Sequence, residues 1–394
     1  MLVSLALMLL LGFSLSGLFK RFNLPGLIGM MIAGMILGPH SFNLISPSIL
    51  SISTELRQIA LIVILLRAGL SLDIKDLIKV GRPAFLMSFL PALFEMGMII
   101  LIAPPLLNIT ILDAAILGAV LAAVSPAVVV PRMIHLIQEG YGKEHKIPQI
   151  VMAGASLDDI FVIVLFTSFV SLRQGQSLDL SILLNLPFSI LSGIGFGLFL
   201  GWVFVLIFKR LHMRDTIKVL LILSLSFLLL GLESLISQYI PFSALLSVIS
   251  MGISILYFYP KVAHRVTSKF SKIWVASELF LFILVGAVVD LSSLQSYAWI
   301  ILIVLLFGLI SRFFGVQASL FKSKLTFKER IFTGIAYIPK ATVQAAIGSI
   351  PLSLGLNSGN IILAAAVLAI LITAPLGALG IDYLSCKLLT KDVV

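Results

Sequence analysis

Long apolar runs alternate along the chain with short polar segments that carry most of the basic residues. A transmembrane helix needs about 20 predominantly apolar residues, and thirteen stretches of this chain have that length. The pattern therefore predicts an all-α polytopic membrane protein with 13 transmembrane helices. The expected spans are residues 2–19, 25–45, 54–72, 83–107, 111–133, 147–172, 181–208, 216–236, 240–259, 271–290, 297–318, 330–350 and 359–386.

The basic residues follow the alternation of these spans. With the N-terminus outside, 22 of the 27 Lys and Arg residues fall in the cytoplasmic loops or at the span ends next to them, and only Arg57 and Arg173 fall at the outer side. Cytoplasmic loops of membrane proteins carry an excess of Lys and Arg. The distribution predicts a multi-pass protein of the cell membrane, with its N-terminus outside and its C-terminus in the cytoplasm.

Composition points to the lipid bilayer as the surrounding medium. The chain is 60% hydrophobic and 11% charged, with a mean hydropathy of +1.18, whereas soluble domains contain about 25% charged residues. No polar stretch is long enough for a soluble domain, so we expect a single membrane domain over residues 1–394. The net charge of +10 follows from the topology and predicts no nucleic-acid partner. The single cysteine, Cys386, excludes an internal disulfide and a cysteine-cluster metal site, and we expect no cofactor.

The odd number of spans divides as six, one and six. Spans 1–6 and 8–13 then have opposite topologies, which is the layout of inverted repeats, and the fifth span corresponds to the twelfth. Both contain proline in mid-run, at Pro126 and Pro131 in the fifth and at Pro339 in the twelfth. Proline removes a backbone donor, and broken helices at membrane depth line cavities. We therefore expect two broken, crossing helices at a transport site, with a simple proline kink as the alternative for each span alone.

Two adjacent carboxylates, Asp158 and Asp159, lie in the middle of the sixth span. A charge at the bilayer centre costs roughly 2.5 kcal/mol or more, and such residues face a protein interior or a wet cavity. Neighbouring helical side chains point about 100° apart, so the two carboxylates meet different surroundings. They are the candidate cation and proton site, including a site for Na⁺, and a structural ion pair is the alternative.

Among the other charges inside predicted spans, three are candidates for the core, and four neutral side chains accompany them. Glu95 is a candidate partner for Arg312 or Lys340, or else a neutral hydrogen-bonded acid. Arg312 lies about 9 Å from the inner end of its span, so snorkelling to the cytoplasm is its alternative. With Asp158 and Asp159, these charges make three acids and two bases, which leaves one negative charge for a monovalent cation or a proton. Possible neutral ligands are Ser125, Ser156, Thr342 and Gln344.

At these residues the chain resembles the monovalent cation/proton antiporter superfamily, in the branch of the NHA-type sodium/proton exchangers. The resemblance covers most of the chain. It is carried by residues 66–70 (LRAGL), 124–131 (VSPAVVVP), 156–160 (SLDDI) and 338–348 (IPKATVQAAIG).

The resemblance implies an NhaA-like fold and a homodimer. A core subdomain would comprise about residues 83–172 and 297–386, and a dimerisation subdomain about 1–72 and 216–290, with a linker helix at about 181–208. Asp159 would be the shared carrier of cation and proton, and Asp158 its partner acid. Arg312 would be the basic core residue with Glu95 as its acid, and Lys340 would lie at the second break.

The sequence departs from the family pattern at two positions. Many relatives carry Thr-Asp-Pro at the first break, where this chain has Val124, Ser125 and Pro126, so a carboxylate is missing from the crossing. Arginine replaces the usual lysine at position 312. Because arginine stays protonated in essentially any protein environment, the exchange stoichiometry of lysine-bearing relatives does not transfer directly.

The sequence therefore predicts a transporter and not an enzyme, namely an antiporter that exchanges cytoplasmic Na⁺ or Li⁺ for external protons in pH homeostasis. Proton and cation would compete at Asp159 while the core subdomain moves between the two sides. The alternative of related fold is a sodium-coupled organic-anion symporter, in which the core bases would hold the anion. Two alternatives belong to other classes of protein. An intramembrane aspartyl protease normally has its two membrane aspartates on separate helices, whereas here they are adjacent on one helix. A non-transporting ion sensor would need a partner that supplies the signalling domain.

Overall fold

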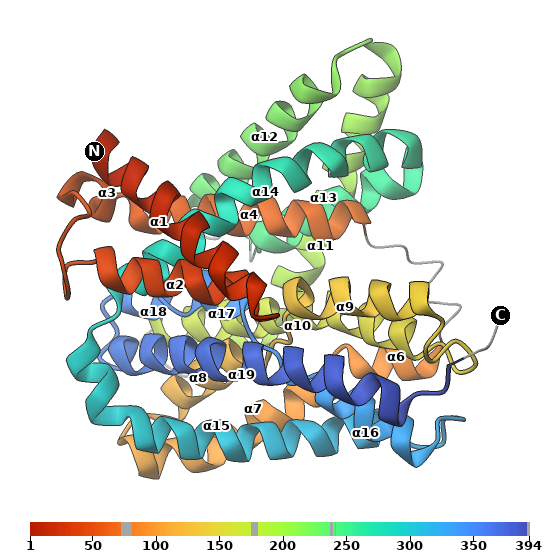
Figure 1. Cartoon of the computed structure of the whole chain (residues 1–394). Helices are drawn as coiled ribbons and strands as arrows, with labels where there is room; N and C mark the ends of the chain where they lie inside the picture. Colours follow the sequence, from red (N-terminus) through yellow and green to blue (C-terminus); the bar gives the residue numbers. More distant parts are fainter. Residues whose placement is uncertain (72–80, 175–179, 237–238, 241, 392–394) are drawn as a thin grey trace. The chain divides into compact units, whose positions relative to one another are not determined.

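The computed structural model describes residues 1–71, 81–174, 180–236, 239–240 and 242–391, without the side chains of residues 156, 174, 180–187, 234 and 291–296 (Figure 1). Every named element in this part of the chain is a helix, as the apolar runs predict. The helices are α1 (Leu2–Arg21), α2 (Gly26–Leu37), α3 (Pro47–Ser51), α4 (Ser53–Ser71), α6 (Arg82–Met87), α7 (Leu90–Leu107), α8 (Ile111–Ala122), α9 (Pro126–Glu139), α10 (Ile147–Gln174), α11 (Leu180–Arg210), α12 (Asp215–Ile236), α13 (Ala244–Phe258), α14 (Pro260–Val288), α15 (Leu291–Ser319), α16 (Phe327–Ala336), α17 (Thr342–Ile347), α18 (Ile350–Ser353) and α19 (Gly359–Leu388).

Nine helical segments among the described residues are long and apolar enough to cross a membrane. Each of them overlaps one of the thirteen expected spans, so nine of the thirteen are matched. The other four correspond to the shorter apolar helices α2 and α13, to α4 with its charged Glu55, Arg57 and Arg67, and to the interrupted run α16–α18. The count of 13 spans therefore stays a prediction.

Several helix boundaries differ from the sequence-based expectation, and two of these differences lie at proline. Helix α2 ends at Leu37, well before residue 45, because Gly38 is extended (φ −69°, ψ 170°) ahead of Pro39, and a residue before proline disfavours the helical region. Helix α14 begins at Pro260, well before residue 271. Proline suits the first helical position, where its missing N–H has no intrahelical partner, so the basic segment expected as a loop is helical.

The chain forms two compact units. The first contains Met1–Thr54, Lys75–Val170 and Leu281–Val394, and the second contains Glu55–Ile74 and Ser171–Phe280. The expected division into core, dimerisation and linker parts stays a prediction.

In the second unit, α11 and α13 pack through small residues. Gly193, Gly197 and Gly201 recur at every fourth position of α11, and an added Cβ at each would lie within 2.3–2.7 Å of the nearest atom of the chain around α13. The hydroxyl of Ser247 donates to the carbonyl of Gly193 across this contact at 2.7 Å. Small residues of this spacing allow close approach of transmembrane helices.

In the first unit, two of the expected spans are interrupted. The first run is not helical at residues 123–125, between α8 and α9 and just before Pro126. The second is not helical at residues 337–341, between α16 and α17 and around Pro339. The N–H of Ser125 donates to the carbonyl of Pro339 at 2.8 Å, so the two extended segments meet. Helices α7, α15 and α19 pack against these runs and supply side chains to the meeting point.

The start of α16 is fixed by a buried carboxylate. Thr326 and Glu329 form a reciprocal capping box, in which Glu329 accepts from the Thr326 N–H at 2.7 Å. His145, just before α10, lies 3.0 Å from the same carboxylate. Burial alone would raise the pKa of Glu329, but the hydrogen bonds from His145 and Thr326 outweigh it and hold that pKa below its ordinary value. This contact ties the helix that carries Asp158 and Asp159 to the helix that leads into the second break.

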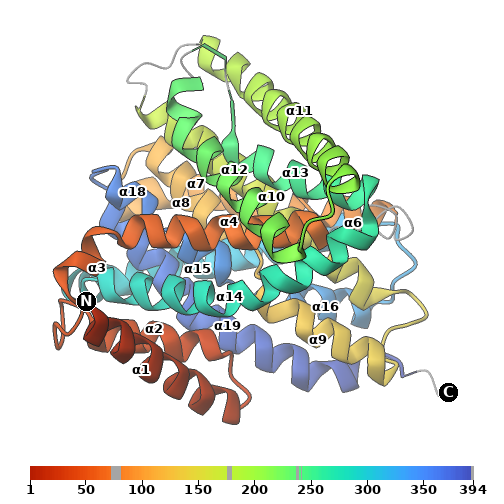
Figure 2. The same cartoon turned by 90° about the horizontal axis from the view of Figure 1, so that it is seen from above.

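Helix α2 lies beside α1, as Figure 2 shows, and its other side approaches the end of α14 at backbone contact. A Cβ added to Gly34 would lie 2.0 Å from the carbonyl oxygen of Ile283, and one added to Gly286 would lie 2.1 Å from that of Met31. Only glycine fits at both positions, because the neighbouring atoms belong to rigid helical backbone.

We expect Gly34→Ala to destabilise the protein by about 1–3 kcal/mol, because the added methyl group forces two helices apart in a packed interior. Thermal unfolding of the detergent-purified protein measures the effect. Gly17→Ala is the matched control, because nothing lies within 4 Å of a Cβ at that exposed helical position. Equal melting temperatures for the two variants would contradict the close approach of α2 and α14.

Candidate functional site: buried charges at two helix breaks

The site is built where the two extended segments meet in the first unit. A helix leaves its last carbonyl groups without intrahelical donors, and a break leaves extended backbone that needs partners. Both needs arise at the end of α8 and at the segment that separates α16 from α17. The side chains that meet them come from α10, α15, α17 and α19 and from Lys340 in the second break, while Glu95 on α7 pairs with two of them.

Arg312, on α15, is the most connected side chain of the site. Its Nη2 donates to Oδ2 of Asp158 at 2.9 Å and its Nη1 to Oε2 of Glu95 at 3.0 Å. Its Nε donates to the carbonyl of Tyr337 at 2.8 Å, and its Nη1 also donates to the carbonyl of Ala122. The side chain is only 2% exposed, so it does not snorkel to the membrane surface.

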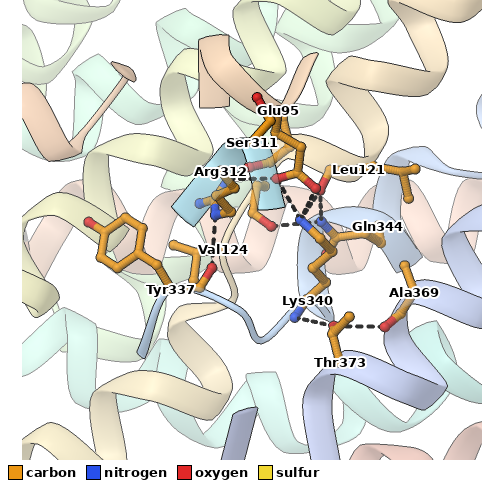
Figure 3. Close-up of polar contacts among 12 residues, drawn as sticks. Glu95, Leu121, Val124, Ser311, Arg312, Tyr337, Lys340, Gln344, Ala369 and Thr373 are labelled. Atoms are coloured by element: carbon orange, nitrogen blue, oxygen red, sulfur yellow. Dashed lines mark hydrogen bonds and ion pairs between the residues drawn. The ribbon is translucent and has the colours of Figure 1, made fainter. Parts of the chain in front are cut away.

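Lys340 lies at the second break and meets the same acid. Its Nζ is 2.7 Å from Oε1 and 2.9 Å from Oε2 of Glu95, and it also donates to the carbonyl of Leu121. Its backbone N–H donates to Oγ1 of Thr373 on α19 at 2.9 Å. Glu95, on α7, is fully buried and therefore bridges the two bases (Figure 3).

Two backbone groups at the first break have side-chain partners. The Val124 N–H donates to Oδ2 of Asp158 at 2.8 Å, and the Gln344 side chain donates to the carbonyl of Ala123 at 2.9 Å. The Lys340 and Arg312 side chains add donors to the carbonyls of Leu121 and Ala122, so three successive carbonyls at the end of α8 accept from side chains. Two cations at this helix C-terminus also oppose the negative end of its dipole.

The two adjacent aspartates have unlike surroundings. Oδ2 of Asp158 is held by Arg312 and by the Val124 N–H, and the residue is fully buried. Asp159 is 9% exposed, and its Oδ1 has no hydrogen-bond partner in the described structure. Arg312 and Lys340 are matched by Glu95 and Asp158, so Asp159 carries the one core charge without an ion pair among the described residues.

Several uncharged oxygens of the breaks are also buried without a partner among the described residues. They are Oγ of Ser125, Oγ1 of Thr342 and Oε1 of Gln344. Ser125 lies at the first break, and Thr342 and Gln344 lie at the start of α17. The side chain of Ser156, the fourth neutral candidate, lies outside the described part of the chain. The described residues contain no cluster of three or more His, Cys, Asp or Glu side chains arranged to hold a metal ion.

Two contributors to the site were not identified from the sequence. Tyr337 lies two residues before Pro339, and its ring is 5.4 Å from the Arg312 guanidinium. Thr373 is a lone polar residue in a long apolar stretch of α19, near Pro375. A polar residue next to a proline in an apolar run is the signal that points to such partners.

Membrane-length apolar helices around charges buried at two helix breaks place the chain among multi-pass ion-transport proteins. The chain belongs to the family of transmembrane sodium/hydrogen exchangers, which its residues 5–384 match. The resemblance drawn from the sequence is thereby confirmed.

Two human proteins illustrate the similarity within the family. Sodium/hydrogen exchanger 9B2 of Homo sapiens is 34% identical over 406 residues, which cover 97% of this chain and 73% of the human protein. Sodium/hydrogen exchanger 9B1 of Homo sapiens is 33% identical over 385 residues, with 93% and 73% covered.

A solved structure shares the fold. The sodium proton antiporter MjNhaP1 from Methanocaldococcus jannaschii at pH 8 superposes with a TM-score of 0.84 over 98% of this chain and 97% of that chain. Its sequence is 22% identical. The arrangement of helices is therefore common to both proteins.

We expect Arg312→Met to destabilise the protein by roughly 3–5 kcal/mol, because it leaves Asp158 buried without its counter-ion and removes donors from two backbone carbonyls. Thermal unfolding in detergent measures the loss. Arg132→Met is the control, since Arg132 pairs with Asp382 at 3.0 Å where the latter is 45% exposed, and such pairs contribute about 0–1 kcal/mol. Equal losses of stability in the two variants would contradict the claim that the Arg312 contacts stabilise the buried site.

Proposed function

We propose that this chain is a secondary active transporter that exchanges a monovalent cation, Na⁺ or Li⁺, for protons across the membrane. Asp159 is the shared site for cation and proton, with Asp158 as its neighbouring acid. The observation that carries the proposal is the unpaired state of Asp159 beside a fully paired set of four core charges. The exchanger names of the relatives support the same reaction.

The chemistry of the exchange follows from competition for one carboxylate. An ionised Asp159 in a largely buried setting needs a positive partner, and either a proton or a small cation supplies it, but not both together. Neutral oxygens of Ser125, Thr342 and Gln344 are candidates to replace part of the water shell of the cation. Apparent cation affinity is therefore weaker in acid, because protons occupy the carboxylate.

The transport cycle that we propose is alternating access. The core subdomain, at about residues 83–172 and 297–386, moves relative to a dimerisation subdomain at about 1–72 and 216–290. The core is built of inverted repeats in a chain of 13 spans, with the N-terminus outside and the C-terminus in the cytoplasm. The active form is a homodimer in the cell membrane.

The contacts of the two bases favour antiport over the symport alternative. An organic-anion symporter would use Arg312 and Lys340 to hold its substrate. Here both side chains already contact Glu95, and Arg312 also contacts Asp158. An anion would have to displace a buried carboxylate from each base, which is costly.

We expect Asp159→Asn to abolish cation-dependent proton flux in liposomes that contain a trapped pH dye, because asparagine cannot bind and release a proton. Glu233→Gln is the matched control. Glu233 is a carboxylate of the second unit that accepts from the Ala244 N–H at 3.0 Å, and glutamine keeps that acceptor. Wild-type flux in Asp159→Asn would rule out the site assignment.

We also expect an exchange of one cation for one proton that moves no net charge. Asp159 with a bound proton and Asp159 with a bound Na⁺ have the same charge, and the other four charges stay paired. The rate should therefore change by less than about twofold when the membrane potential is clamped at 0 or roughly −100 mV, a difference worth about 2.3 kcal/mol per moved charge. A rate that follows the potential several-fold would show that a second group titrates.

A further inference from the structure

Thr373 is a fully buried residue of α19 whose hydroxyl makes two hydrogen bonds, one of them to the second helix break. Its Oγ1 accepts from the Lys340 N–H at 2.9 Å and donates to the carbonyl of Ala369, one turn earlier on α19, at 2.7 Å (Figure 3). The second bond is an ordinary one for a threonine inside a helix. The first is not, because it satisfies a backbone donor that belongs to no helix.

This backbone donor belongs to a peptide group that contacts both breaks and α19. The carbonyl of Pro339 accepts from the Ser125 N–H at the first break at 2.8 Å, and the N–H of Lys340 donates to Thr373. Both atoms belong to one planar peptide group, in which the carbonyl and the N–H of the trans form point in opposite directions. The peptide group is therefore held on one side by the first break and on the other by Thr373.

Helix α19 also contacts this peptide group through close packing. A Cβ added to Gly377, one turn after Thr373, would lie 2.3 Å from Cγ of Pro339 and 3.0 Å from its backbone nitrogen. Residues 373 and 377 lie on the same face of a helix. Packing at Gly377 sets how near the break lies to α19, and the directed bond from Lys340 to Thr373 sets how the peptide group is turned.

The orientation of this peptide group matters for the uncharged oxygens on its two sides. Ser125 is bonded to it through its own N–H, and Thr342 follows Lys340 by two residues at the start of α17. The Oγ of Ser125 and the Oγ1 of Thr342 are both buried without a partner among the described residues. Binding groups must be held to within about 0.5 Å of the productive geometry by the residues behind them. The bond between Thr373 and Lys340 supplies such support between the two breaks.

We propose that Thr373 is a positioning residue for the transported cation. Its hydroxyl fixes the Pro339–Lys340 peptide group, and through it the separation of the Ser125 and Thr342 oxygens that bind Na⁺ or Li⁺. The inference rests on the proposed exchange function and deepens it, because it assigns part of the cation affinity to a residue of α19 outside the five core charges.

The test is Thr373→Val, which removes the hydroxyl and keeps the branched shape of the side chain. We expect the apparent KM for Na⁺ to rise about fivefold, as for the loss of one hydrogen bond. The maximal rate should stay within about twofold of the wild type, because every core charge is retained. Thr373→Ser keeps the acceptor oxygen and should restore the wild-type KM. Both quantities are measured as Na⁺-dependent proton flux in liposomes.

Thr333→Val is the matched control. Thr333, on α16, is also fully buried, and its hydroxyl donates to the carbonyl of Glu329 one turn earlier at 2.8 Å. The control therefore removes the same hydroxyl and the same kind of intrahelical bond as Thr373→Val. It leaves the bond between Thr373 and Lys340 in place, so its KM should equal that of the wild type.

Gly377→Ala tests the same peptide group from the packing side if Thr373→Val does not yield folded protein. The added methyl group would overlap the ring of Pro339, so the break must shift away from α19. We expect a raised KM for Na⁺ in this variant as well. A wild-type KM in folded Gly377→Ala would show that cation binding does not depend on the position of the break.

The outcomes separate this inference from the function on which it rests. A wild-type protein without cation-dependent proton flux would overturn the proposed exchange. An active wild type, with an unchanged KM in folded Thr373→Val, would overturn the role of Thr373 and leave the exchange standing. An equal rise of KM in Thr333→Val, or a raised KM that persists in Thr373→Ser, would assign the effect to packing and would also overturn the inference.

Discussion

The Arg312 guanidinium is the interaction on which the two helix breaks depend. It donates to acceptors on four segments: Glu95 on α7, the carbonyl of Ala122 at the end of α8, Asp158 on α10 and the carbonyl of Tyr337 before α17. Backbone at membrane depth has no lipid partner for its polar groups, so breaks persist only where protein groups satisfy them. The planar fork of arginine, with five donors, can reach four acceptors at once, which a lysine ammonium cannot do in this geometry.

Ion pairing alone would not justify these charges in the interior. A buried pair often adds little stability against an apolar replacement, because desolvation offsets the attraction. Here the same side chains also cap the carbonyl groups of Leu121 and Ala122. An apolar replacement would leave those carbonyls without donors, at a cost of about 1–3 kcal/mol each. The charges and the broken backbone therefore require one another.

Sequence reasoning located the elements of this arrangement but not its pairing. Pro126 and Pro339 marked the two breaks, because proline has a direct effect on the local helix. The five core charges were conspicuous because each lies in an apolar run. Which base contacts which acid depends on packing among helices far apart in the chain. The same holds for the Tyr337 carbonyl, which accepts from Arg312, and for the Thr373 hydroxyl, which accepts from the Lys340 N–H. A backbone carbonyl that accepts a hydrogen bond, such as that of Ala122, cannot be predicted from the identity of the side chain.

The unlike surroundings of Asp158 and Asp159 follow from helix geometry. Adjacent residues on a helix point about 100° apart, so once Asp158 faces Arg312 and the first break, Asp159 must face elsewhere. The uncharged serine at position 125 agrees with this division. The Ser125 N–H already joins the breaks through Pro339, and a carboxylate there would add a fourth acid to a core with two bases that are both already paired. With an uncharged Ser125, Asp159 is the one acid among the five core charges that has no ion pair in the described structure.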